Sequence, residues 1–226
     1  MKKPLTILGL IPIFAMAAEL TFTSPQGFSI TPPDGWAVAS KEIAGQLSRA
    51  VQEHFQKLGN IDLDKLAVVI FNPNDAEGSQ NLNVVVSPHR IPIDESDAEE
   101  KLVKMLKDQY AQIGVQIGSV AVNRKTFGTH AALVSDVESN FGGPPMRQWQ
   151  VMLPAGSRTL IVTCSAPQAS FGQAIPAFTK AIESMTYTTV TDPLSEMPVW
   201  LREALIGALI GGAITLYRVL ASRRRT

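Results

Sequence analysis

The stretch RQWQVMLPAGSRTLIVTCSA, residues 147–166, decides the fold class. It contains two apolar runs joined by a turn at Ala155 and Gly156, which is the pattern of a β-hairpin. Two similar runs precede it, GSVAVNRK (118–125) and AALVSDVES (131–139), and turns at Phe127-Gly128 and at residues 142–145 separate the runs. Four strand patterns in succession predict an antiparallel meander.

Strand patterns also occur before the meander. The run LAVVIFN (66–72) is continuously apolar, which predicts a central strand buried on both faces, and NLNVVVS (81–87) predicts a second strand. Residues 20–40 read as short strands broken by turns.

Helical patterns lie on both sides of these strands. Ser96 and Glu99 form a capping-box pattern that predicts a helix running to about Ile113. Apolar side chains recur on one face of residues 40–58 and of a last helix in which Pro176 either starts the second part or causes a kink. The apolar faces are Ile43, Leu47, Val51, Phe55 and Leu58, and Phe171, Ile175, Phe178, Ile182 and Met185. We therefore expect an α+β fold, a central antiparallel sheet flanked by helices in an α/β/α sandwich.

The N-terminus has the pattern of a signal peptide over residues 1–17. Lys2 and Lys3 precede an uncharged run, and Ala15-Met16-Ala17 offers a small-x-small cleavage site, with cleavage after Ala17 or Ala18. The alternative is an uncleaved anchor, but the apolar run is short for a span. The exported domain then covers residues 18–188.

The C-terminal region predicts one transmembrane helix at residues 199–221, after a linker at 189–198. Its uncharged part is short, but Trp200 and Tyr217 suit the interface, and the basic tail at 222–226 indicates a cytoplasmic C-terminus. The predicted location is therefore a cell membrane, single-pass, with the domain on the periplasmic or extracytoplasmic side. An interfacial or buried helix is the alternative.

Gly207 and Gly211 form a G-x-x-x-G pair in this helix. Such a pair permits close helix packing, so a homodimer through the membrane helix is one expectation. Glycine is common in transmembrane helices, so the pair also has an explanation without pairing.

The whole chain has 20 basic and 20 acidic residues. The two ends hold seven of the basic residues and one of the acidic residues, which leaves 13 against 19 in the middle, a net charge of −6. A mildly acidic domain gives no electrostatic basis for binding nucleic acid, so that class of function is excluded.

The order of elements and three sequence features resemble those of the PsbP-like superfamily. This superfamily includes the extrinsic photosystem II protein, DcrB-type lipoproteins and a Ran-binding nuclear import factor. The features are the segment GFSITPPDGW (27–36), the long capped helix before the meander, and the segment FTKAIESMTY (178–187). The resemblance implies a sheet with helices on both sides and mostly binding, assembly or accessory work. It implies that Trp36 anchors a turn to the core and that Ile182 and Met185 form a packing face. The lipidated cysteine of DcrB-type proteins has no counterpart near residue 18.

Residues that carry catalytic or metal chemistry are few. His54, His89 and His130 share no short metal-ligand spacing, and serine-hydrolase, phosphate-loop and dinucleotide patterns are absent from the sequence. Cys164, the only cysteine, lies in an apolar run and reads as a small buried side chain. We therefore expect no cofactor, no metal site and no catalytic residue.

Two acidic segments could suggest cations. Asp94, Glu95, Asp97, Glu99 and Glu100 crowd a helix start, where the helix dipole favours acids, so we interpret them as a solvated helix end. The loop at residues 72–78 has oxygen ligands but lacks the EF-hand order.

The best candidate for partner contact is the hairpin tip formed by Phe141, Gly142, Gly143, Pro144, Pro145 and Met146. Its alternative explanation is an ordinary turn. The sequence therefore predicts a non-catalytic, membrane-anchored accessory domain that assists an unknown envelope or membrane protein. The alternative is a small-molecule carrier or enzyme with a pocket between sheet and helix.

Overall fold

The computed structural model describes residues 21–39, 66–75, 79–112, 115–140 and 144–189. The signal peptide, the helix at 40–58, the span at 199–221 with Gly207 and Gly211, and the basic tail were all predicted outside these ranges. Within the described ranges, no helix has the length and apolar character needed to cross a membrane.

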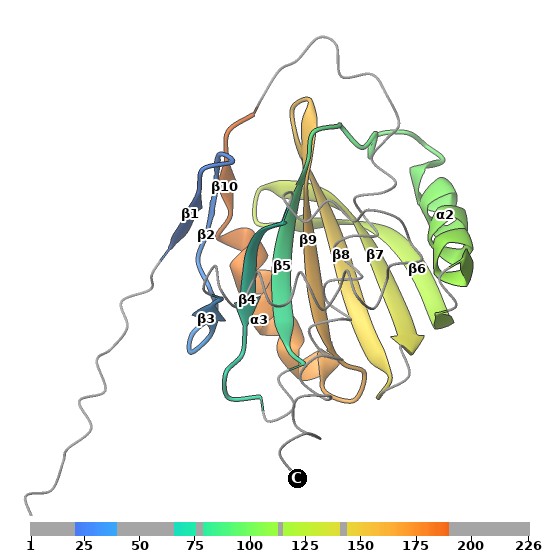
Figure 1. Cartoon of the computed structure of the whole chain (residues 1–226). Helices are drawn as coiled ribbons and strands as arrows, with labels where there is room; N and C mark the ends of the chain where they lie inside the picture. Colours follow the sequence, from blue (N-terminus) through green and yellow to red (C-terminus); the bar gives the residue numbers. More distant parts are fainter. Residues whose placement is uncertain (1–20, 40–65, 76–78, 113–114, 141–143, 190–226) are drawn as a thin grey trace, which may run out of the picture.

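The centre of the fold is a seven-stranded antiparallel sheet (Figure 1). The predicted meander is confirmed, because its four strands pair in succession with continuous registers. From one edge to the other the strands are β3 (Ala37–Val38), β4 (Leu66–Phe71), β5 (Asn81–Ser87), β9 (Arg158–Pro167), β8 (Met146–Ala155), β7 (His130–Asn140) and β6 (Gln116–Phe127).

The apolar run at 66–72 is not the central strand that its composition predicted. It forms β4, which lies next to the two-residue edge strand β3, and only its Val68, Val69 and Ile70 are buried. The central positions belong to β5 and β9, whose polar and apolar side chains are almost all buried. The apolar composition of residues 66–72 therefore predicted that the strand has buried residues, but it did not predict the position of the strand in the sheet.

A second, three-stranded sheet joins the two ends of the domain. Its strands are β1 (Phe22–Ser24), β2 (Phe28–Ile30) and β10 (Thr186–Tyr187), with β2 in the middle. The Arg158 guanidinium at the start of β9 donates to the carbonyls of Gln26, at 2.6 Å, and of Thr188, at 2.9 Å. Arg158 therefore fixes both ends of the domain to the β8–β9 hairpin.

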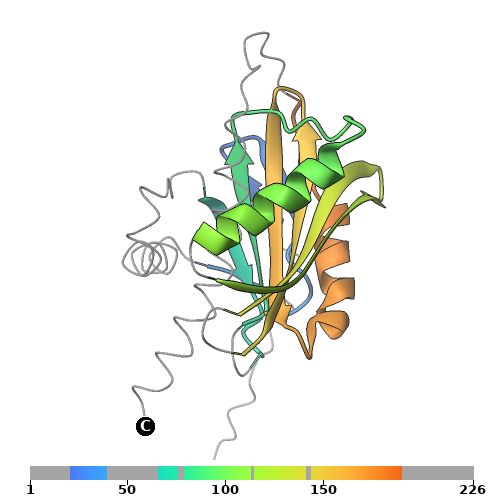
Figure 2. The ribbon, with the colours of Figure 1, turned by 90° about the vertical axis from the view of Figure 1, so that its right-hand side faces the viewer.

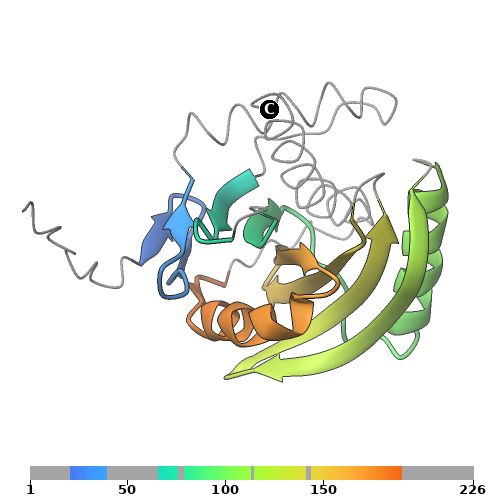
Figure 3. The ribbon, with the colours of Figure 1, turned by 90° about the horizontal axis from the view of Figure 1, so that it is seen from below.

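Two helices cover opposite faces of the large sheet (Figure 2). They are α2 (Ala98–Gln112) and α3 (Phe171–Glu183). The sheet curves around α3, and α2 lies on its outer side (Figure 3). Successive side chains of a strand point to opposite faces of the sheet. The sheet therefore contributes side chains to two separate apolar clusters, one under each helix.

The cluster under α3 is rich in aromatic rings. Phe178 is fully buried, with its ring centroid 5.7 Å from those of Trp36 and Phe171. Ile182 and Met185 are also buried, and the Trp36 amide donates to the Pro33 carbonyl in a turn. The expected roles of Trp36, Ile182 and Met185 are thus confirmed.

Pro176 lies inside α3, which is assigned as one helix from Phe171 to Glu183. Pro176 itself is exposed, so its ring does not take part in the core contact. Of the two outcomes expected for this proline, a break that starts a second helix is therefore wrong.

We predict that Phe178→Ala lowers the free energy of unfolding by about 3–5 kcal/mol, because it leaves a cavity between two aromatic rings. Its neighbour Thr179 lies at the partly exposed side of α3, and Thr179→Ala should change stability by no more than about 0.5 kcal/mol. Urea unfolding of the full chain in detergent, followed by tryptophan fluorescence, measures both. Equal midpoints for the two variants would contradict the central position of Phe178.

Candidate functional site

The hairpin tip predicted as a partner contact is only partly an exposed feature. Phe141, Gly142 and Gly143 lie outside the described residues, and Pro144 and Pro145 are exposed. The prediction is wrong for Met146, which is 2% exposed because it begins β8 and pairs with Ser139 and Pro167. A methionine in that position packs inside the sheet and offers no surface to a partner.

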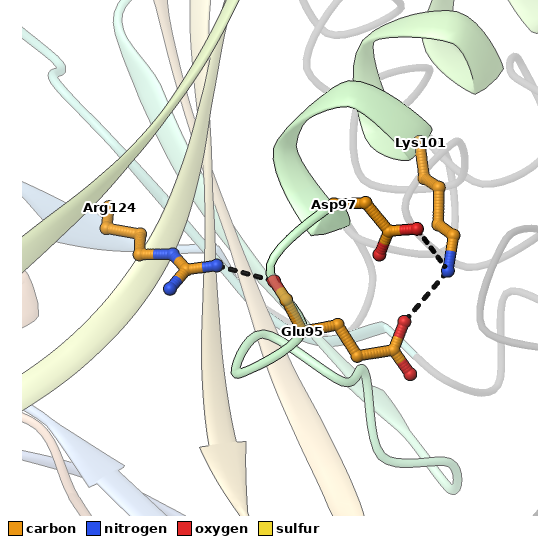
Figure 4. A network of polar contacts seen from close by, with 4 residues as sticks. All are labelled: Glu95, Asp97, Lys101 and Arg124. Carbon is orange, nitrogen blue, oxygen red and sulfur yellow. Dashed lines mark hydrogen bonds and ion pairs between the residues drawn. The ribbon is translucent and has the colours of Figure 1, made fainter.

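The acidic residues before α2 are matched by basic side chains (Figure 4). Lys101 Nζ lies 2.9 Å from a Glu95 carboxylate oxygen and 3.0 Å from one of Asp97. The Arg124 guanidinium reaches across from β6 to donate to the Glu95 carbonyl at 2.6 Å, and it pairs with Glu99 at 3.3 Å. These contacts agree with a solvated, charge-balanced helix end.

The start of α2 differs from the predicted capping box. The Lys101 amide donates to the Asp97 carbonyl, so Asp97, not Ser96, is the residue at which the helical hydrogen bonds begin. The Glu99 carboxylate, expected to turn back to the helix start, pairs with Arg124. Arg124 of β6 therefore binds the Glu99 carboxylate that the sequence pattern predicted to cap the helix.

In the described part of the 72–78 loop, side-chain oxygen atoms accept hydrogen bonds from nearby residues. One Asp75 carboxylate oxygen accepts hydrogen bonds from the Ser79 amide at 2.6 Å, the Ser79 hydroxyl at 3.1 Å and the Gln80 amide at 2.9 Å. This loop therefore has a structural explanation for its aspartate. Within the described residues, no group of three or more histidine, cysteine, aspartate or glutamate side chains is placed to hold a metal ion.

The structure does not bring the predicted chemistry-bearing residues together into one site. His54 lies outside the described residues, His89 follows β5, and the His130 ring packs on Tyr187 with centroids 5.2 Å apart. Cys164 is fully buried in β9, and burial raises the pKa of its thiol, which agrees with a structural role.

A charged cluster that sequence reasoning missed lies on the α3 face of β6, β7 and β8. The Arg147 guanidinium donates two hydrogen bonds of 2.8 Å, one to each carboxylate oxygen of Asp136. The Trp149 indole donates to Asp136 at 2.9 Å, and Lys125 Nζ lies 4.1 Å from the centroid of the Trp149 ring. We call these four residues, Lys125, Asp136, Arg147 and Trp149, the cationic strip.

The carboxyl of Asp136 is held in its charged form. Burial alone would raise its pKa, but the hydrogen bonds from Arg147 and Trp149 and the charges of Arg147 and Lys125 outweigh burial, so the pKa lies below its ordinary value. The same pair raises the pKa of Arg147. Asp136 therefore acts as a fixed counter-charge and does not exchange protons at neutral pH.

The cationic strip borders a part of the sheet that α3 leaves open. On this face, Ser119, Ala121, Asn123 and Lys125 of β6 are exposed. The Arg147 side chain is 36% exposed, whereas that of Asp136 is 19% exposed. The strip therefore presents two cations to solvent above a largely covered carboxylate. Spacing along one strand could not have revealed it, because its members come from three strands.

The opposite face carries a second unexpected feature, a band of buried uncharged polar side chains. Gln148 donates to Ser165 at 3.0 Å and accepts from the Tyr110 hydroxyl at 3.3 Å, and Ser135 donates to Gln150 at 3.4 Å. The members, all at most 1% exposed, are Asn81, Asn83, Ser135, Gln148, Gln150, Thr163 and Ser165. We call them the polar band.

Among the described residues, Asn81 Oδ1 and Thr163 Oγ1 of the polar band have no hydrogen-bond partner. Buried polar atoms normally have partners, so each of these atoms requires water or another group. The alternating pattern at 81–83, 148–150 and 163–165 was visible in the sequence, but alternation of this kind ordinarily predicts a solvent-facing side.

No protein-family model and no curated protein sequence matches this chain. Several solved structures are similar in arrangement. Cyanobacterial PsbP (CyanoP) of Synechocystis sp. PCC 6803 has a TM-score of 0.47 and 13% identity, over 80% of this chain and 98% of its own. LpqN of Mycobacterium tuberculosis, described as involved in cell envelope biogenesis, has a TM-score of 0.39 and 12% identity, over 71% and 83%.

A protein of Bacteroides thetaiotaomicron VPI-5482 has a TM-score of 0.44 and 12% identity over 74% of this chain, which spans 47% of that protein. A PsbP protein is thus among the similar structures. At identities and TM-scores this low, the likeness assigns no function to any residue.

We predict that Asp136→Asn lowers the free energy of unfolding at neutral pH by about 1–3 kcal/mol, because Arg147 and Trp149 lose a charged acceptor. The loss should be smaller than for a fully buried pair because solvent reaches Arg147. Since the folded-state pKa of Asp136 is lowered, its stabilisation is complete above 3.8, its ordinary pKa, and is lost as pH falls through the lowered value.

The stability difference between the original chain and Asp136→Asn should therefore shrink as the pH falls from neutral through about 4 and below. Urea unfolding at several pH values measures it. Glu138→Gln is the control, since it removes a carboxylate from the same strand and leaves the bidentate pair intact. A difference that stays constant over this pH range would contradict the lowered pKa.

Proposed function

We propose that this protein is a non-catalytic accessory domain that binds an envelope or membrane protein through the cationic strip. The observation that supports the proposal is that two cations on an open part of the sheet are held in fixed positions. Arg147 is held by a bidentate pair with Asp136, and Lys125 is held over the Trp149 ring. Side chains that are already ordered lose little conformational entropy when a partner binds.

The chemistry of the strip suits a partner segment that carries carboxylates. Asp136 accepts hydrogen bonds from Nε and one Nη of Arg147, so the second Nη of Arg147 is not used in this pair. Among the described residues, Lys125 Nζ contacts the Trp149 ring and forms no ion pair with an acid. Tryptophan and arginine are also enriched where protein interfaces have their strongest contacts. An acidic segment would receive charge-assisted hydrogen bonds from both cations.

The proposed address follows from the sequence. A signal peptide at 1–17 and a single span at 199–221 would hold the domain on the extracytoplasmic side of a membrane, with residues 222–226 in the cytoplasm. A tethered domain needs only modest affinity, because the membrane confines it close to its partner. This address fits assistance to a membrane assembly.

We predict that Lys125→Met reduces recovery of a specific membrane protein with the full chain. An exposed charge contributes up to about 1 kcal/mol, so the affinity should fall by up to about fivefold. Crosslinking in native membranes followed by affinity purification and quantitative mass spectrometry measures the recovery. The substitution keeps most of the side-chain stem and should leave the fold intact, because Lys125 is exposed.

The matched control is Lys104→Met. Lys104 is an exposed lysine on α2, on the other side of the sheet, and its loss changes the net charge by the same amount. Recovery that falls equally in both variants would indicate a general effect of charge and would count against the strip. Recovery that is unchanged in Lys125→Met would contradict the proposal directly.

A second candidate function is that of a carrier for an uncharged small molecule, and the polar band favours it. Its side chains are amides and hydroxyls, which recognise neutral hydrogen-bonding groups, and Asn81 Oδ1 and Thr163 Oγ1 have no partner. Burial raises the pKa of Tyr110, so the hydroxyl beside the band stays protonated at neutral pH. The described members of the band thus suit binding more than proton transfer.

The carrier function predicts that a small molecule co-purifies with the chain and that Thr163→Val abolishes its retention, since Val cannot hydrogen-bond. Native mass spectrometry and analysis of extracted small molecules measure this. If Thr163 only leaves a polar atom unsatisfied, Thr163→Val should instead be neutral or stabilising in urea unfolding, with no change in bound molecules. Cys164→Ser, at the neighbouring residue on the other face, controls for disturbance of β9.

A further inference from the structure

No described strand pairs with the long outer edge of β6. β6 has 12 residues, more than any other described strand, and it is the last strand of the sheet. Among the described residues it pairs only with β7, and no backbone hydrogen bond from another described segment reaches its outer side. The opposite edge strand, β3, has two residues.

Proteins normally protect such an edge with charges, prolines or bulges. The two ends of β6 have these features, because the register shifts between Ile117 and Ser119 and because Arg124 and Lys125 lie near the other end. The five residues between them, Ser119-Val120-Ala121-Val122-Asn123, contain no charge, proline or bulge. We call residues 119–123 the unprotected segment.

The residue types of the unprotected segment are symmetric about Ala121. Each end is an uncharged polar residue, each second position is valine, and the centre is alanine. In an antiparallel pair related by a two-fold axis at Ala121, Val120 stands opposite Val122 of the second copy, and Ser119 stands opposite Asn123. Every residue then meets one of its own kind, and no two like charges within β6 stand directly opposite.

From this match we propose that β6 pairs with β6 of a second copy of the chain, which joins two seven-stranded sheets into one. Such an interface is self-complementary and closed by two-fold symmetry. Val120 and Val122 are partly buried against the α2-side cluster, so their cross-strand contact would extend an existing apolar cluster.

The surroundings of the edge leave room for this pairing. A shallow hollow lies between α2 and β6, lined by Lys107, Ala111 and residues 117–120. The side chains of a second β6 on the α2 side would enter space that α2 does not fill. On the other side of the sheet, the side chains of Ser119, Ala121 and Asn123 are exposed. The inference is independent of the partner proposed for the cationic strip.

Cysteine crosslinking of the full chain in detergent tests the register. Ala121 is exposed, and directly opposite Cβ atoms lie about 4.5–5.5 Å apart, so Ala121→Cys should form a disulfide-linked dimer under mild oxidation. Asn123→Cys alone should not, because its two copies lie about 13 Å apart along the strands. A mixture of Ser119→Cys and Asn123→Cys chains should crosslink, and the native Cys164 is buried. Ala131→Cys, exposed on β7, is the control.

A second variant tests the pairing without chemistry on cysteine. Ala121→Lys places two lysines opposite each other at the two-fold axis and should weaken self-association by at least about tenfold, whereas Ala121→Thr should preserve it. Light scattering of the detergent-solubilised chain measures the mass.

A monomeric original chain without a crosslink at Ala121→Cys would overturn the proposal. A dimer insensitive to Ala121→Lys but lost in Gly207→Leu would overturn it in favour of pairing through the C-terminal helix. Another protein that binds the original chain and is lost in Ala121→Lys would overturn it in favour of an edge that accepts a foreign strand.

Discussion

The rest of the structure depends on one constraint, which is that the central strands β5, β9 and β8 are buried on both faces. A sheet buried on both sides needs a cover on each, and the two faces are built from different chemistry. On the α3 face, Trp36, Phe171 and Phe178 pack edge to face or tilted against aliphatic strand residues. On the α2 face, apolar residues share the surface with the polar band, which stabilises by hydrogen bonds and not by area alone.

Much of the fold could be predicted from local sequence because its contacts are local. The meander has hairpin connections, so each strand of β6 to β9 pairs with its neighbour in sequence, and alternation with turns at Gly128 and Gly156 was sufficient. Both glycines have positive φ, which other residues rarely adopt. The order β3-β4-β5-β9 was not predicted, because the β5–β9 pairing joins residues far apart in the chain and no local pattern specifies it.

The candidate site was less predictable than the fold for the same reason. Asp136, Arg147 and Trp149 were each read as ordinary strand residues, and their meeting depends on the register of β7 with β8, which places Asp136 directly opposite Trp149. The tip was chosen for its turn residues and neighbouring apolar side chains, and Met146 proved to be core because the strand begins there. A shift of one residue in the register moves every side chain of a strand to the other face of the sheet. An error of one position along the chain therefore reverses which side chains are predicted to be exposed.

The small sheet connects both ends of the described domain to the large sheet. β1 and β10 both pair with β2, so the first and last described strands belong to the same small sheet, beside the β3 edge (Figure 1). Arg158 hydrogen-bonds this small sheet to the β8–β9 hairpin. A force applied to the chain after β10 would therefore be transmitted to the large sheet through Arg158. It would also act on the two residue pairs that join β10 to β2. The small sheet also contacts the β6–β7 turn, because the His130 ring at the start of β7 packs on Tyr187 of β10. The membrane anchor proposed after β10 would therefore attach close to the β6–β7 turn. Lys125 lies opposite Ala132, two residues from His130, whereas Arg147 lies opposite Glu138, further along β7. The anchor would thus be nearer to Lys125 than to Arg147.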